Sequence, residues 1–140
     1  MNKAIDGDSP LSDLRVLDLS RVLAGPFAGR MLADLGAEVV KVEPPGLDVT
    51  RNWGAKFGSI SGYYHQQNAG KKNISINLKT EAGVNLIKSL VKETDILIEN
   101  FRPDVMERLG LGWESLQKIN PRLIMLSISP SSVYNNCKLW

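Results

Sequence analysis

The sequence contains very little cysteine or histidine. Cys137 is the single cysteine and His65 the single histidine among the 140 residues. One thiol cannot close an internal disulfide, and it cannot supply a cysteine-based zinc site. A lone histidine in an irregular stretch is more typical of a surface residue than of a catalyst, although it can titrate near neutral pH. We therefore expect no metal in this protein.

Long apolar runs and a strong charge of either sign are also lacking. The composition is 43% hydrophobic and 23% charged, which fits one globular domain with a workable core. A net charge of +2 is too small to indicate nucleic-acid or membrane binding. Residues 1–10 are polar, unlike a signal peptide, and no apolar run could cross a bilayer. We expect a cytoplasmic protein with a flexible leader over residues 1–10 and a fold that begins at Leu11.

A strand-turn-helix unit stands near the N-terminus. Val16–Leu19 reads as a buried strand, and a helix is predicted to open at Gly25-Pro26 because proline is favoured at the first helical position. Gly36 is a plausible end of this helix. Four of its large apolar residues recur at helical spacing and are predicted to face the core: Phe27, Met31, Leu32 and Leu35.

Strands and helices then alternate along the chain. Four further strands are expected at Glu38–Glu43, Asn73–Leu78, Asp95–Glu99 and Leu123–Ile128. Helices are expected after Thr80, after Pro103 and from Trp113 to Ile119, and Leu47–Lys72 reads as a long loop. The pattern predicts an α/β fold, with a Rossmann-like, mostly parallel sheet and helices on both faces. Strict alternation in Asn73–Leu78 places that strand at or near an edge.

A nucleotide-binding module is one functional interpretation of this pattern. Glu43 ends the second strand, where an acid could bind a ribose. However, the first turn lacks the G-x-G-x-x-G fingerprint, and Gly70-Lys71-Lys72 does not fit a phosphate-binding P-loop. The nucleotide-binding module remains an alternative.

Several motifs occur in an order that resembles one enzyme family. They are VLDLSRVLAGPFA at 16–28, LADLGAEVVKVEP at 32–44, GKKNISINLK at 70–79, IENFRP at 98–103 and LGLGW at 109–113. Residues 11–129 resemble the N-terminal part of the class III CoA-transferases, the CaiB–BaiF or formyl-CoA transferase type, which are related to the α-methylacyl-CoA racemases. The resemblance implies an incomplete large domain of such an enzyme. It also implies transfer of CoA from an acyl-CoA to a small carboxylic acid, and a homodimer in full-length relatives.

The resemblance further implies which residues contact coenzyme A. They are Leu23, Ala24, Ile76, Asn77, Leu78, Lys79, Asn100, Phe101, Arg102 and Arg108. Cationic side chains suit the phosphates, because a guanidinium can donate two hydrogen bonds to phosphate oxygens. Taken singly, these residues also have structural explanations, such as a solvated lysine, a helix-terminal arginine or a core phenylalanine. Some family members have arginine where Pro44 stands, so that phosphate contact cannot be made here.

The resemblance ends after Ser129. A glycine-rich loop and then the nucleophilic aspartate are expected to follow, but residues 130–140 contain no glycine and match nothing in the family pattern. We therefore expect that the catalytic aspartate lies beyond this chain, which would bind coenzyme A without turnover. The alternative is a non-catalytic truncated fragment or interaction module.

Overall fold

The fold is built on one parallel sheet. The computed structural model describes residues 9–129, so most of the expected leader and all of residues 130–140 lie outside the described part. The strands follow the order β5-β2-β1-β6-β7, and every neighbouring pair is parallel. Their bounds are β1 (Arg15–Asp18), β2 (Glu38–Glu43), β5 (Lys72–Ser75), β6 (Ile96–Glu99) and β7 (Ile124–Ser127). The expected α/β class is confirmed.

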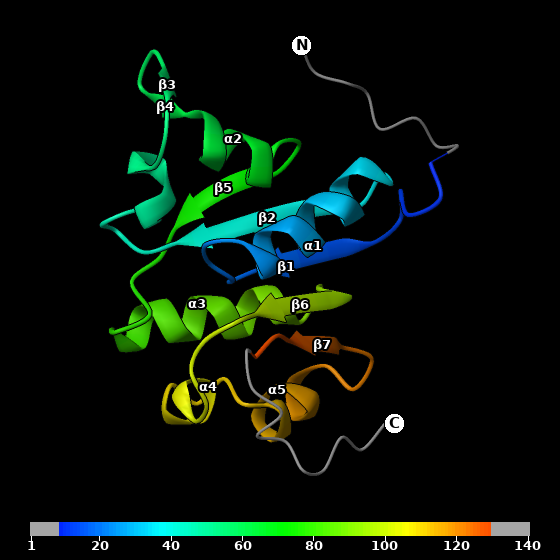
Figure 1. Cartoon of the computed structure of the whole chain (residues 1–140). Coiled ribbons are helices and arrows are strands. Elements are labelled where there is room, and N and C mark those ends of the chain that lie inside the picture. Colours follow the sequence, from blue (N-terminus) through cyan, green and yellow to red (C-terminus); the bar gives the residue numbers. More distant parts are fainter. Residues whose placement is uncertain (1–8, 130–140) are drawn as a thin grey trace.

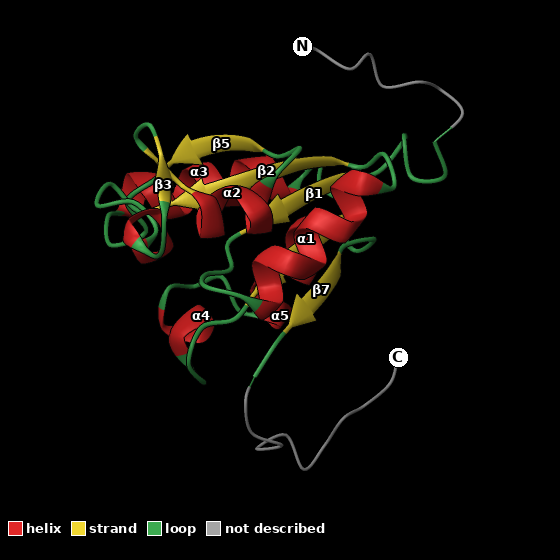
Figure 2. Cartoon of the chain, turned by 45° about the horizontal axis from the view of Figure 1, so that its top comes forward, coloured by secondary structure: helices red, strands yellow, loops and turns green. Residues whose placement is uncertain are grey.

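Helices lie on both faces of the sheet (Figures 1 and 2). One face carries α1 (Ala24–Asp34) and α2 (Gly62–Asn68). The other carries α3 (Glu81–Val91), α4 (Val105–Arg108) and α5 (Trp113–Ile119). Among the described residues, no helix is long and apolar enough to cross a membrane.

Two hydrophobic cores follow from the alternation of side chains along the strands. In β1, Val16 enters the smaller core beneath α1, and Leu17 enters the larger core beneath α3 and α5. A strand that is buried on both faces must be apolar at successive positions, which explains the short apolar runs in the sequence. Strand β5 lies at the end of the strand order and pairs only with β2 within the described residues, so the expected edge position of this strand is confirmed.

Strands β1 and β6 are neighbours in the sheet, although 77 residues lie between Asp18 at the end of β1 and Ile96 at the start of β6. From β1 the chain crosses to β2 on one side, and from β6 it crosses to β7 on the other. The carboxyl ends of β1 and β6 therefore mark the point where the winding direction reverses. Open α/β sheets bind ligands in the crevice at this point.

The predicted inward face of α1 is wrong. Phe27, Met31 and Leu35 are about half exposed, and of the four predicted residues only Leu32 packs against the core. The buried residues of the helix are instead Gly25, Pro26 and Gly29. Small residues let the α1 backbone approach the sheet closely, and this close contact turns the large side chains outward.

The prediction of a long loop between Leu47 and Lys72 is also wrong. This segment contains η1 (Val49–Asn52), a hairpin of β3 (Lys56–Phe57) and β4 (Ile60–Ser61), and α2. Polar side chains cap the N-termini of η1 and α2. Asp48 accepts from the Thr50 N–H at 3.0 Å, and Ser61 accepts from the Tyr64 N–H at 3.2 Å. Elements this short show no hydrophobic period, so the pattern could not reveal them. His65 is exposed on α2, as expected for a surface histidine.

The close packing of α1 can be tested by substitution. A Cβ atom at Gly25 would lie 2.2 Å from the Ser20 Cβ, so Gly25→Ala should destabilise the fold by about 1–3 kcal/mol. Phe27→Ala on the exposed side of the same helix should cost about 1 kcal/mol or less. Urea denaturation of both variants measures the difference. Equal losses from the two substitutions would contradict this packing.

Candidate functional site

A pocket of about 270 Å³ opens at the carboxyl ends of β1, β2, β5 and β6. Its walls combine apolar residues of the larger core with two cations, Arg21 and Lys79. The lining residues are Leu19, Arg21, Val42, Glu43, Pro44, Ile76, Asn77, Leu78, Lys79, Phe101, Val105 and Leu109. The pocket therefore lies at the edge where α/β sheets bind their ligands.

The structure brings together half of the residues expected to contact coenzyme A. Ile76, Asn77, Leu78, Lys79 and Phe101 all line the pocket. The other five lie outside its lining. Leu23, Asn100 and Arg102 lie on the connections that follow β1 and β6, Ala24 begins α1, and Arg108 ends α4. Sequence reasoning did not single out Arg21, which lines the pocket.

The segment that follows β5 is held by a turn and a helix cap. The Asn77 side chain accepts from the Lys79 N–H at 3.0 Å, and Thr80 Oγ1 accepts from the Gly83 N–H at 3.2 Å. A Cβ atom at Gly83 would lie 2.1 Å from the Asn77 carbonyl oxygen, so this contact requires glycine. The turn fixes the backbone of Lys79 at the rim of the pocket.

Four cations without an ion-pair partner in the described part of the chain lie along this edge of the sheet. Arg21, Lys79, Arg102 and Arg108 are exposed, and none of them pairs with a carboxylate among residues 9–129. Glu99 is buried and accepts from the Phe101 N–H at 2.8 Å, so its charge is directed into the protein. Exposed acids also lie on these segments, at Glu81, Asp104 and Glu107, but none of them lines the pocket. The unpaired Arg21 and Lys79 in the lining favour an anionic ligand there.

Asn100 joins the two turns at the point where the winding reverses. Its Oδ1 accepts from the Arg21 N–H at 2.7 Å, and its Nδ2 donates to the Arg21 carbonyl oxygen at 2.7 Å. Val22, which follows Arg21 in the chain, has a φ of 71°, a conformation that is uncommon for a β-branched residue. The paired hydrogen bonds hold this unusual turn in place.

Glu43 forms the centre of a buried polar cluster behind the pocket. Its oxygens accept from Arg51 Nε at 2.8 Å, from Arg51 Nη2 at 2.7 Å and from the Asp48 N–H at 2.9 Å. The Tyr64 hydroxyl and the Asn73 amide also donate to it. Because both oxygens are occupied and the side chain is 1% exposed, Glu43 is not available to a ribose, contrary to the nucleotide-module interpretation.

These partners change how Glu43 and its neighbours titrate. Burial raises the pKa of Glu43, but the hydrogen bonds from Arg51, Tyr64 and the Asp48 N–H outweigh it and lower this pKa to about 2. Burial and the neighbouring Glu43 carboxylate raise the pKa of Tyr64. The hydrogen bond to Glu43 raises the pKa of Arg51. The cluster therefore stays charged at neutral pH, with the Arg51 cation balancing the Glu43 anion.

A second buried ion pair connects α1 and α2 to the sheet. Lys71 Nζ donates to Asp18 Oδ2 at 2.7 Å, to the Pro26 carbonyl oxygen at 2.7 Å and to Asn68 Oδ1 at 3.0 Å. Burial lowers the pKa of Lys71, while Asp18 opposes that change. Nothing in the sequence pattern indicates this pair, because lysine and aspartate are almost always exposed.

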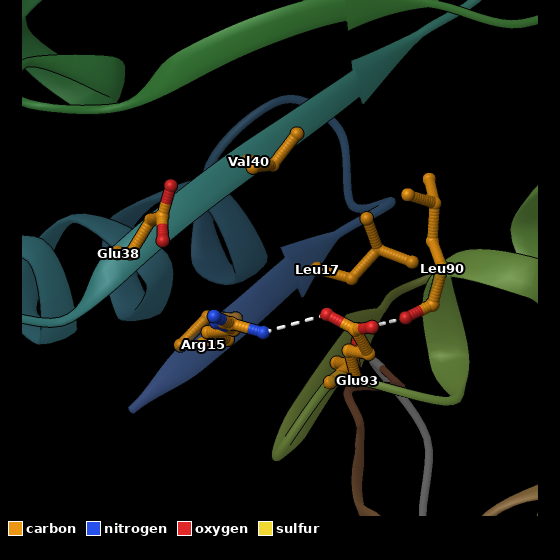
Figure 3. A pocket seen from close by; sticks show the side chains of 8 residues that line it. Arg15, Leu17, Glu38, Val40, Leu90 and Glu93 are labelled. Carbon is orange, nitrogen blue, oxygen red and sulfur yellow. Dashed lines mark hydrogen bonds and ion pairs between the residues drawn. The ribbon is translucent and has the colours of Figure 1, made fainter. Parts of the chain in front are cut away.

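A larger hollow, of about 290 Å³, lies at the other end of the strands, the amino end (Figure 3). Leu17, Val40 and Leu90 form its apolar part, and Arg15 pairs with Glu93 across it at 2.8 Å. It lies at the amino ends of β1 and β2, and its arginine is already neutralised. We therefore place the candidate site at the smaller pocket. Residues 9–129 contain no group of three or more His, Cys, Asp and Glu residues arranged to hold a metal ion.

Comparisons with known proteins agree with this fold. The family model of CoA-transferase family III matches residues 11–130. The succinate–glutarate CoA-transferase of Agrobacterium fabrum is 49% identical over 128 residues, which is 86% of this chain and 32% of that protein. The succinyl-CoA–D-citramalate CoA-transferase of Chloroflexus aurantiacus is 49% identical over 122 residues, 86% of this chain and 30% of that protein.

A solved structure also matches. The crystal structure of a CAIB/BAIF family protein from Brucella suis has a TM-score of 0.81 at 44% identity, covering 85% of this chain and 33% of that one. The chain thus spans about a third of the length of the curated relatives that it matches.

The buried Glu43 predicts a specific loss of stability in acid. Its pKa is about 2 in the folded protein against an ordinary 4.5, so its contribution is complete above pH 4.5 and is lost as the pH falls towards 2. The loss should be on the order of 3 kcal/mol. Glu43→Gln should flatten the dependence of unfolding free energy on pH in this window, as measured by urea denaturation at several pH values. The exposed ion pair of Arg15 and Glu93 offers a control, because Glu93→Gln should leave the slope of unfolding free energy against pH unchanged. An unchanged slope in Glu43→Gln would contradict the prediction.

Proposed function

The chain belongs to CoA-transferase family III, and from this membership we propose that its pocket binds the nucleotide end of coenzyme A. The observation that carries the proposal is the apolar pocket rimmed by unpaired cations at the carboxyl edge of the sheet. An adenine ring requires an apolar slot, and the phosphates require charge-assisted donors. The pocket offers both.

The proposed contacts divide between the base and the phosphates. Ile76, Leu78 and Phe101 would pack against the adenine, because they form part of the apolar wall of the pocket. Lys79 at the rim would bind phosphate, and Arg102 and Arg108 would add charge from the connection after β6. The remaining predicted contacts would meet the coenzyme along the same edge of the sheet: Leu23, Ala24, Asn77 and Asn100.

The wider activity is also a proposal. Relatives carry names such as succinate–glutarate CoA-transferase, so we propose acyl-CoA and a small carboxylic acid as the substrates of the enzyme type to which these residues contribute. In such a reaction a carboxylate attacks the thioester carbonyl and forms a mixed anhydride, while the thiolate of coenzyme A leaves. The homodimer expected for full-length relatives is likewise proposed. The half-exposed Phe27 and Met31 on α1, and Leu35 directly after it, support this proposal.

Five of the described acids are poorly placed to act as such a nucleophile. Asp18 is buried against Lys71, Glu43 against Arg51, and Glu99 accepts from a backbone N–H. Asp34 pairs with Arg30 on α1, and Asp95 lies beside the amino end of β6. We therefore propose that the 140-residue chain binds coenzyme A without transferring acyl groups.

The first test is the choice of ligand. The chain should bind coenzyme A more tightly than NAD, because it has cations for the phosphates but no glycine fingerprint. Arg108→Ala should weaken coenzyme A binding by about 1.5–3 kcal/mol, the range for a hydrogen bond to a charged group. Calorimetry with both ligands measures the preference. Equal affinities, or an unchanged Arg108→Ala variant, would count against the proposal.

The second test is turnover. The purified chain, incubated with succinyl-, formyl- or acetyl-CoA and several carboxylate acceptors, should show no acyl exchange by mass spectrometry. The physical reason is that Asp18, Glu43 and Glu99 at the ends of the strands are each buried and already bonded within the protein. A covalent acyl adduct on any acid of the chain, or sustained exchange free of contaminating enzyme, would refute the proposed inactivity.

A further inference from the structure

We infer that Arg21 is the second phosphate-binding cation of the pocket, acting opposite Lys79. The inference rests on the proposed function, because it assigns a further residue to the same coenzyme. Arg21 leaves the carboxyl end of β1, and Lys79 follows the end of β5, so the two cations reach the pocket from separate strands. A ligand with several phosphate groups can then be held from two sides.

The charges of both residues are available to a ligand. No ion pair involves Arg21 or Lys79 within residues 9–129. Glu43 is the single acid in the lining of this pocket, and Arg51 already neutralises it behind the wall. No carboxylate of the lining therefore competes with a phosphate for the Arg21 guanidinium.

The backbone of Arg21 is fixed before any ligand arrives. Asn100 bonds to both its N–H and its carbonyl oxygen, each at 2.7 Å. Two residues earlier, the Leu19 N–H donates to the Ile98 carbonyl oxygen at 2.8 Å, which continues the pairing of β1 with β6. A residue held in this way loses less conformational freedom on binding, so more of each charge-assisted bond contributes to affinity. Asn100 thereby acts as a positioning residue for Arg21.

Pro44 leaves Arg21 as the cation on its side of the pocket. Pro44 directly follows β2, which pairs with β1, and it lines the same pocket as Arg21. It can contribute no charge from that side, so the wall formed by β1 and β2 has Arg21 as its one lining cation. A guanidinium placed at position 44 would enter the same space, which gives a direct test of the role of charge there.

Calorimetry with coenzyme A tests the inference on the whole 140-residue chain. Arg21→Ala should weaken binding about 10- to 100-fold, the range for a lost hydrogen bond to a charged group. Arg21→Lys should retain part of the affinity, because it keeps the charge but loses the planar, two-bond geometry. The double variant Arg21→Ala with Pro44→Arg should recover affinity. Arg122→Ala removes the same charge before β7, at the amino edge of the sheet, and should leave binding unchanged.

Each outcome separates the inference from the proposed function. If the unmodified chain does not bind coenzyme A, the proposed function fails and the inference fails with it. If the unmodified chain binds and Arg21→Ala binds equally well, only the inference fails. Equal weakening by Arg122→Ala would overturn it in favour of a general charge effect. A loss that neither Arg21→Lys nor the double variant recovers would overturn the charge-based role of Arg21.

Discussion

The buried pair of Lys71 and Asp18 is the contact on which the arrangement of this fold depends. Both side chains are at most 1% exposed, and isolated burial of either charge would cost several kcal/mol. The cost is offset because Lys71 Nζ also donates to the Pro26 carbonyl oxygen and to Asn68 Oδ1. One ammonium group thus joins β1, α1 and α2. It can reach Asp18 because Gly29 leaves space, as a Cβ atom there would lie 2.8 Å from the Asp18 carboxylate.

The segment between β2 and β5, together with β5 itself, determines the electrostatics of the candidate pocket. Arg51, Tyr64 and Asn73 all bond to Glu43, so the acid that ends β2 is neutralised from behind the wall. The rim at Arg21 and Lys79 then remains positive. Buried polar groups that are fully bonded cost little, and here they also leave the surface charge available for an anion. Stability and ligand preference therefore come from one set of contacts.

Binding and chemistry occupy different places in the proposed function. The pocket would hold the nucleotide end of coenzyme A, and the reacting thioester would lie at the far end of that molecule. Binding energy from a remote part of a substrate can be used to orient the reacting group. A chain of this kind can therefore contribute to a transferase without supplying the nucleophile.

The sequence by itself determined the five strands of the parallel sheet, the α/β class and the family, because apolar runs, alternation and ordered motifs are local properties of the chain. It located the edge strand β5 and four residues after it that line the pocket, Ile76–Lys79. Only the tertiary structure decided which side of α1 faces the sheet, because Gly25 and Gly29 pack closely while Phe27 stays outside. It alone brought Asn100 to Arg21, 79 residues away. Hydrogen bonds and ion pairs between residues far apart in the chain depend on where strands meet in space. Periodicity in the sequence does not predict them.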